Sequence, residues 1–172
     1  LSGRYKAANG SILLDSIDTA NASTTAVTQQ NLNPNHRLIP AGVIGANDRL
    51  RAWMGASKNG TTAAITLRFH FGPLGTIADP VIATVLDLAT TNISYGTLME
   101  FKRITATTIQ KQGNGNPGDS YGGANATAYP AAVAVSNMDT TAMYFSISSQ
   151  ADVSGEIVTL QDYTLELYST YS

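Results

Sequence analysis

Two stretches of the chain alternate regularly between apolar side chains and side chains of other kinds. Residues 48–54 alternate in this way, and residues 65–71 do so again. A period of two is that of a β-strand with one buried face. Between the two stretches, Asn59 and Gly60 form a dipeptide that strongly favours a tight reverse turn. The two stretches are therefore predicted to pair as a β-hairpin.

One face of this predicted hairpin is apolar, and the opposite face collects a different set of side chains. That face carries three of the six arginines, the single tryptophan and one of the two histidines, namely Arg49, Arg51, Trp53, Arg68 and His70. Arginine and tryptophan are enriched at protein interfaces. We expect these five residues to form an oligomer interface. The alternative is a solvated sheet face on which aliphatic arginine stems cover the tryptophan.

Further strands are predicted at the spacing of a sandwich or barrel. Most are apolar or alternating runs, and the last is expected to split near Gln161 and Asp162: residues 80–88, 97–110, 129–136, 142–148 and 156–168. The chain is rich in Ser, Thr, Asn and Gly and has only three Glu and four Lys, a balance that disfavours helices. We therefore predict an all-β antiparallel β-sandwich of about eight to ten strands.

The length of the chain is that of one ordinary domain. Its 172 residues are expected to form a single domain, in which residues 1–35 are a loosely structured N-terminal arm or edge strands. With no cysteine, the chain has neither a disulfide framework nor a cysteine-based zinc site. A net charge of −2 and the lack of any basic run argue against nucleic acid as a partner. No apolar run is long enough to insert into a membrane.

Catalytic signatures are absent from the sequence. The two histidines, His36 and His70, stand in no nucleophile motif, and neither belongs to a metal-ligand spacing. The glycine-rich residues 113–118 do not precede a predicted helix and are not followed by Lys-Ser or Lys-Thr. They therefore do not match a phosphate-binding loop. We predict that the protein is not an enzyme and uses no cofactor and no metal.

The segment 111–128 contains five glycines and three asparagines, and it is predicted to be a long exposed loop. Tyrosine offers a flat apolar face and a hydroxyl at low entropy cost. Tyr121 is therefore a candidate to stack on a sugar ring while its polar neighbours bond the hydroxyls. The candidate ligand-binding residues of this loop are Asn116, Asp119, Tyr121 and Asn125. Alternatively, the loop tyrosine tethers the loop to the body of the domain.

Four short motifs between residues 38 and 72 resemble a known pattern. They are Leu-Ile-Pro-Ala-Gly at 38–42, Asp-Arg-Leu-Arg-Ala at 48–52, Asn-Gly-Thr at 59–61 and Ile-Thr-Leu-Arg-Phe-His-Phe-Gly at 65–72. This succession is similar to that in bacteriophage virion proteins with a trimeric, tumour-necrosis-factor-like jelly-roll knob. The N-terminal part departs from a fibre protein, because it shows neither heptads nor a collagen-like repeat.

The resemblance implies a homotrimer on the outer surface of a virion, without catalytic residues. Its implied partners are further copies of the chain, other virion proteins, and a glycan or protein of the host surface reached through distal loops. Two alternatives stay open. The first is a capsid decoration or head structural protein of the same fold. The second is a monomeric carbohydrate-binding module, which a single tryptophan on an arginine-rich face fits less well.

Overall fold

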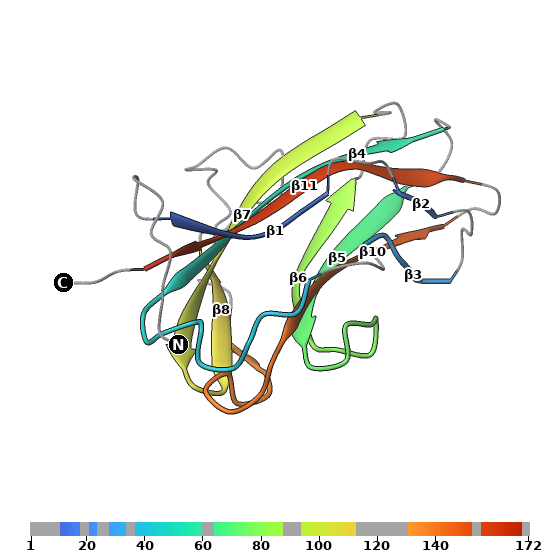
Figure 1. The fold of residues 1–172 in the computed structure, drawn as a ribbon. Helices are drawn as coiled ribbons and strands as arrows, with labels where there is room; N and C mark the ends of the chain where they lie inside the picture. Colours follow the sequence, from blue (N-terminus) through green and yellow to red (C-terminus); the bar gives the residue numbers. More distant parts are fainter. Residues whose placement is uncertain are drawn as a thin grey trace, which may run out of the picture.

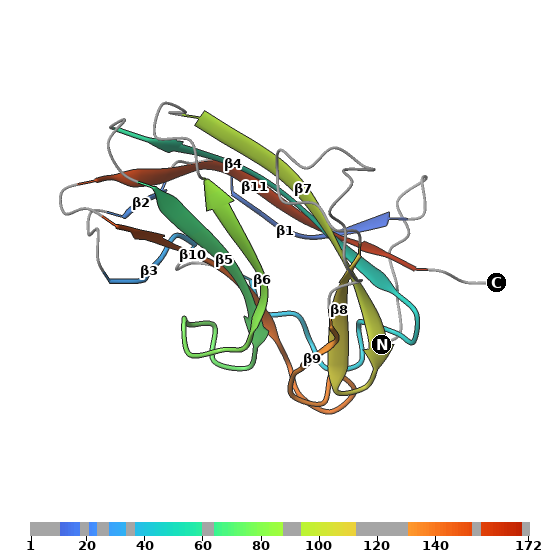
Figure 2. The same ribbon diagram turned by 180° about the vertical axis from the view of Figure 1, so that it is seen from behind.

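The computed structural model is a two-sheet β-sandwich (Figures 1 and 2). It describes residues 11–17, 21–23, 28–33, 37–59, 64–87, 94–112, 131–152 and 156–169. These ranges contain eleven strands and no helix. Sheet A holds β1 (Ser11–Ile17), β2 (Asn21–Ser23), β4 (Arg49–Lys58), β7 (Ser94–Thr105), β8 (Thr108–Gln112), β9 (Val133–Ala134) and β11 (Val158–Tyr168). Sheet B holds β3 (Gln30–Asn31), β5 (Ile65–Gly72), β6 (Val81–Asp87) and β10 (Tyr144–Ala151).

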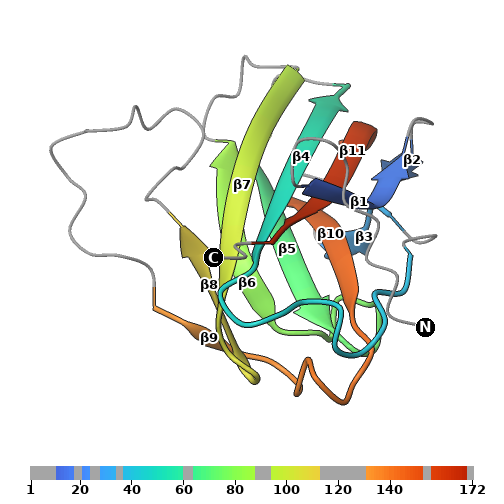
Figure 3. The same cartoon turned by 60° about the vertical axis from the view of Figure 1, so that its left-hand side comes forward.

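Eight of the strands follow the strand order of a jelly roll. Their antiparallel pairs are nested along the chain: β5 pairs with β6, β4 with β7, β3 with β10 and β1 with β11. Successive nested pairs alternate between the two sheets, which gives the orders β1-β11-β4-β7 and β3-β10-β5-β6. β8 and β9 extend sheet A beyond β7 (Figure 3). The predicted all-β antiparallel sandwich of the jelly-roll type is thus confirmed.

The predicted hairpin between residues 48–54 and 65–71 is wrong. The first stretch lies in β4, which pairs with β7 and β11, and the second lies in β5, which pairs with β6 and β10. Alternation indicates which face of a strand is buried, but it does not indicate which strand is the partner. The two apolar rows do meet in the core, but they approach from opposite sheets. Gly60 and Thr61 of the expected turn lie outside the described residues.

The other predicted strands are present with changed limits. The run 97–110 is two strands, β7 and β8, joined by a tight turn after Thr105. Within 129–136, the described part forms only the two-residue strand β9. The last strand is continuous, but its register shifts between Leu160 and Asp162, where a split was expected. This β-bulge keeps one strand in the sheet while changing which side chains face outward.

Aromatic side chains from both sheets fill the centre of the sandwich. Phe145 of β10 packs at ring-centroid distances of 5.7 Å from Phe69 and 6.4 Å from Phe71, its neighbours on β5. It also meets Phe101 at 5.7 Å and Tyr163 at 6.1 Å, which come from sheet A. All five rings are buried. Phe145 therefore contacts both apolar layers, and Phe69 also meets Phe101 across them at 6.1 Å.

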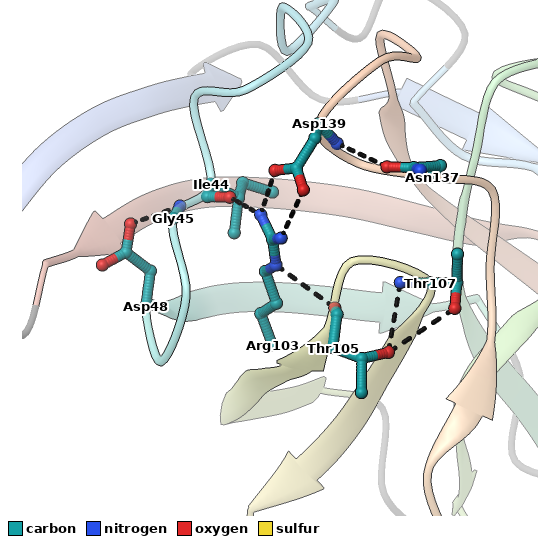
Figure 4. A network of polar contacts seen from close by, with 8 residues as sticks. All are labelled: Ile44, Gly45, Asp48, Arg103, Thr105, Thr107, Asn137 and Asp139. Carbon is teal, nitrogen blue, oxygen red and sulfur yellow. Dashed lines mark hydrogen bonds and ion pairs between the residues drawn. The ribbon is translucent and has the colours of Figure 1, made fainter.

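One end of the sandwich is held by a buried arginine (Figure 4). Arg103 is 6% exposed, and its guanidinium donates to both carboxylate oxygens of Asp139, at 2.7 and 2.8 Å. It also donates to the carbonyls of Ile44 and Thr105. The hydrogen bonds from Arg103 lower the pKa of the Asp139 carboxyl below its ordinary value. Three connections between strands are thus fixed to one another at this end of the molecule.

The motif at residues 38–42 lies in one of these connections and has a structural role there. Ile39 is buried and forms an isolated antiparallel bridge with Met143. Gly42 has a φ of 74°, a left-handed conformation that favours glycine, and its N–H donates to the Met138 carbonyl at 2.8 Å. The motif at residues 38–42 therefore holds the connection that leads into β4.

Candidate functional site

The outer face of sheet A, which points away from the core, presents three of the predicted interface residues. Arg49, Arg51 and Trp53 are alternate residues of β4 and project from this face, while Leu50 and Ala52 between them are buried. Trp53 is 41% exposed, as the prediction of an exposed tryptophan requires. Its cross-strand neighbour on β7 is Leu98, which is 52% exposed. An exposed indole beside an exposed leucine marks this face as the candidate site.

The arginines of this face are engaged by its carboxylates. Arg51 donates to one oxygen of Glu100 from Nε at 2.9 Å and from Nη2 at 2.5 Å. It also donates to the Tyr168 hydroxyl at 3.0 Å, and that hydroxyl donates to Glu166 at 2.8 Å. Arg49 lies 3.7 Å from the second oxygen of Glu100. The bonds to Glu100 raise the pKa of Arg51 above its ordinary value. These cations are therefore neutralised within the sheet face.

Two glycines beside Trp53 lie under large side chains. Gly55 and Gly96 are cross-strand partners, on β4 and β7. A Cβ added to Gly96 would lie 3.3 Å from Cη2 of Trp53 and 3.5 Å from its Cζ2, so the edge of the indole ring lies over Gly96. Asp162 of β11 is the other cross-strand partner of Gly55, and its carboxylate lies against this glycine. The four residues Trp53, Gly55, Gly96 and Asp162 are called the indole platform below.

The other two predicted interface residues lie on the opposite side of the sandwich. Arg68 and His70 belong to β5 of sheet B and therefore do not share a surface with Trp53. Arg68 is partly exposed and donates to the Gln150 side chain at 2.9 Å. His70 is only 1% exposed, so the prediction that it lies on the surface is wrong. The five residues cannot form one interface patch on a single copy.

His70 is buried because polar groups cover it on the outer side of sheet B. Its Nδ1 is 2.9 Å from the carbonyl of Asp79, which can only accept, so Nδ1 carries the proton. Its Nε2 is 2.8 Å from Ser148 Oγ and 2.8 Å from the Gln29 side-chain nitrogen. Gln29 also donates to Ser148 Oγ at 2.7 Å. A serine that is 0% exposed beneath a glutamine offers no access to a substrate, so this cluster fastens Gln29 to the sheet.

We expect this cluster to make stability depend on pH. Burial lowers the pKa of His70, so the unfolded chain takes up a proton at a higher pH than the folded chain does. Arg68 lowers it further, whereas Asp79 opposes the shift. The free energy of unfolding should therefore fall as the pH drops below about 6.5. Replacing His70 by Gln should cost about 1–3 kcal/mol at pH 8 and flatten the pH dependence. Urea unfolding of both proteins at pH 8 and pH 5 checks this, and parallel pH profiles would contradict it.

The candidate ligand loop cannot be compared with the structure. Asn116, Asp119, Tyr121 and Asn125 all lie outside the described residues, so their ligand-binding role stays a prediction. Within the described ranges, no group of three or more His, Asp or Glu side chains is placed to hold a metal ion. The same ranges contain no helix of the length and hydropathy needed to cross a membrane.

The sequence predicts an exposed Trp53, but it does not predict the rest of the indole platform. The signal available was an isolated glycine within each of two strand patterns, at Gly55 and Gly96, since such glycines often mark a close approach to the backbone. Asp162 could not be placed, because the bulge before it decides which way its side chain faces.

Comparison with known proteins finds distant structural similarity only. No protein-family model matches the chain, and no curated protein does. Among solved structures, it is similar to the CBM2 module of the evolved Dit of Lactobacillus casei BL23 phage J-1, with 10% identity and a TM-score of 0.40 over 95% of this chain and 99% of that one. The infectious bursal disease virus Gx strain structure matches with 9% identity and a TM-score of 0.38, over 91% of this chain and 30% of that one.

Proposed function

We propose that this chain is a non-enzymatic structural domain of a bacteriophage virion. It lies on the outer surface of the particle, assembles as a homotrimer and attaches the particle to the host cell surface. The observation that carries the proposal is the nested jelly-roll pairing, in which the motifs that resemble phage knob proteins occupy defined places. Residues 38–42 lie in the connection that leads into β4, where Ile39 forms its bridge with Met143. Residues 65–72 are β5 itself.

The surface of the domain supports a role in recognition. A sandwich gains nothing for its own folding from an exposed tryptophan, whereas an interface or a ligand site uses one. Trp53 lies on a sheet face whose charges are paired internally, as the Arg51–Glu100 contact shows. Such a face presents apolar and hydrogen-bonding groups to a partner without a large net charge. Other virion proteins and a host-surface ligand are the partners that we propose for the domain.

The proposal is tested by the position and the mass of the protein. Antibodies against the chain should label intact phage particles in gold-labelling electron microscopy, which checks the virion surface. In light scattering behind size exclusion, we expect a mass near three times 18.1 kDa, and a concentration-independent monomer would remove the trimer. Arg68→Glu, on the outer face of sheet B, should lower this mass, because it reverses a charge at the surface that we propose meets the next copy.

A further inference from the structure

We propose that the indole platform binds a neutral hexopyranose ring of a glycan. This inference rests on the proposed function, since it names the ligand class by which such a domain would attach to a cell surface. It places the binding site on described residues of sheet A, which are other residues than those of the candidate loop at 111–128.

The indole ring of Trp53 lies over the sheet at a position where Gly96 leaves room for it. Any side chain larger than glycine at position 96 would press against the ring, because its Cβ would lie 3.3 Å from Cη2 of Trp53. Glycine inside a strand weakens it, so a glycine here needs another reason than strand stability. Gly96 lets the ring edge lie low over β7, and 41% of Trp53 stays exposed. The ring thus presents an aromatic surface that does not need to reorder before a ligand binds.

Asp162 belongs to the same cross-strand row as the two glycines of the platform. Asp162, Gly55 and Gly96 are successive cross-strand partners on β11, β4 and β7. The β-bulge between Leu160 and Asp162 turns this exposed side chain to the outer face. Among the described residues, no hydrogen bond or ion pair reaches its carboxylate, whereas its neighbour Gln161 donates to Ser57 Oγ at 2.7 Å. An open acceptor therefore lies beside the aromatic surface.

A hexopyranose matches these two features together. One face of such a ring is lined by C–H groups and can stack on an aromatic ring, while its hydroxyls lie around the rim. A carboxylate accepts hydrogen bonds from hydroxyls and makes short, strong ones. A few well-placed polar groups beside an apolar contact are the usual composition of a small-ligand site. The platform therefore combines stacking on Trp53 with hydroxyl recognition by Asp162.

The charges of the face favour a neutral sugar over other occupants. Arg51, two residues before Trp53 on β4, is occupied by Glu100 and Tyr168, so it is not open to a carboxylate or phosphate of an anionic sugar. Asp162 itself would repel such groups. Gly55 and Gly96 carry no side chain, so they leave room beside the indole for a flat uncharged ring.

The test uses the fluorescence of the protein, because Trp53 is the only tryptophan in the sequence. The purified chain is titrated with cellotetraose, mannotetraose and galactotetraose, and with sorbitol as the control that has hydroxyls but no ring face. We expect a saturable change in emission with at least one tetrasaccharide and none with sorbitol. If no tetrasaccharide changes the emission more than sorbitol does, the proposal is overturned, while gold labelling of particles still decides the proposed function separately.

Variants locate the site, with binding measured by calorimetry so that the loss of Trp53 does not remove the signal. Trp53→Ala should weaken binding by about tenfold or more, and Trp53→Phe by less, because phenylalanine keeps an aromatic face. Asp162→Asn should weaken it by about tenfold, the size expected for a hydrogen bond to a charged group. Leu74→Ala is the control: this exposed leucine lies in the connection between β5 and β6 of sheet B, away from the candidate face, and should leave sugar binding unchanged.

Two results would overturn the assignment. If Asp162→Asn binds as the wild type does, Asp162 takes no part and the two-residue site is wrong. If Trp53→Ala and Leu98→Ala both lower the mass in light scattering, this face is covered by a second copy of the chain rather than by a sugar. Unchanged mass in both variants, together with loss of sugar binding in Trp53→Ala but not in Leu74→Ala, supports the platform. Both residues are exposed, so neither substitution is expected to prevent folding.

Discussion

Replacing Phe145 by Ala is expected to lower the free energy of unfolding by about 3–5 kcal/mol. The ring is buried and lies between four other aromatic rings, two on β5 of its own sheet and one each on β7 and β11 of sheet A. Removing it opens a cavity at the plane where the two sheets meet. The strands that line this cavity cannot move in to fill it without disturbing the hydrogen bonds to their neighbours within each sheet. Urea unfolding followed by circular dichroism measures the loss.

Tyr163→Phe is the matched control for this prediction. Tyr163 belongs to the same cluster and stacks on Phe145, but no described group bonds its buried hydroxyl. Burial raises the pKa of this hydroxyl well above its ordinary value, because the ionised form is poorly solvated there. Removing only the oxygen keeps the packing and should cost less than about 1 kcal/mol. A loss of less than about 1 kcal/mol for Phe145→Ala would mean that the sheets repack around the gap.

The sequence predicts the buried faces of the strands but not their partners. In β4 and β5, the side chains expected to face the core are indeed buried, among them Leu50, Met54 and Phe69. The period of two is a property of one strand and its environment, so it can be read locally. Pairing depends on how the connection between the strands runs. Here it crosses from one sheet to the other, and an Asn-Gly pair does not report that crossing.

His70 shows why exposure is harder to predict than the face on which a residue lies. It does project from the side of β5 opposite the core row, as the alternation predicts. It is nevertheless buried, because Gln29 and Ser148 bond it there. The segment that carries Gln29 lies far from His70 in the sequence, so no local sequence pattern indicates that His70 is covered. The indole platform was missed for a related reason, since it combines residues of β4, β7 and β11.

Replacing Gly72 by Ala is expected to lower the free energy of unfolding by about 2–4 kcal/mol. A Cβ at this position would overlap the carboxylate of Asp79. That carboxylate is buried and accepts three backbone hydrogen bonds, from Leu74 at 3.1 Å, Gly75 at 2.6 Å and Thr76 at 3.2 Å. It cannot move aside without leaving these N–H groups unpaired. The connection between β5 and β6 would have to rearrange.

Gly55→Ala is the matched control, because the same overlap is expected there with a different outcome. Its Cβ would meet the carboxylate of Asp162, but that side chain is exposed and can rotate into solvent. Replacing a strand glycine by alanine also restricts the unfolded chain, so the net cost should stay below about 1 kcal/mol. Urea unfolding of both variants checks the contrast. Equal losses would show that close packing against the glycine, rather than the freedom of the opposing carboxylate, sets the cost.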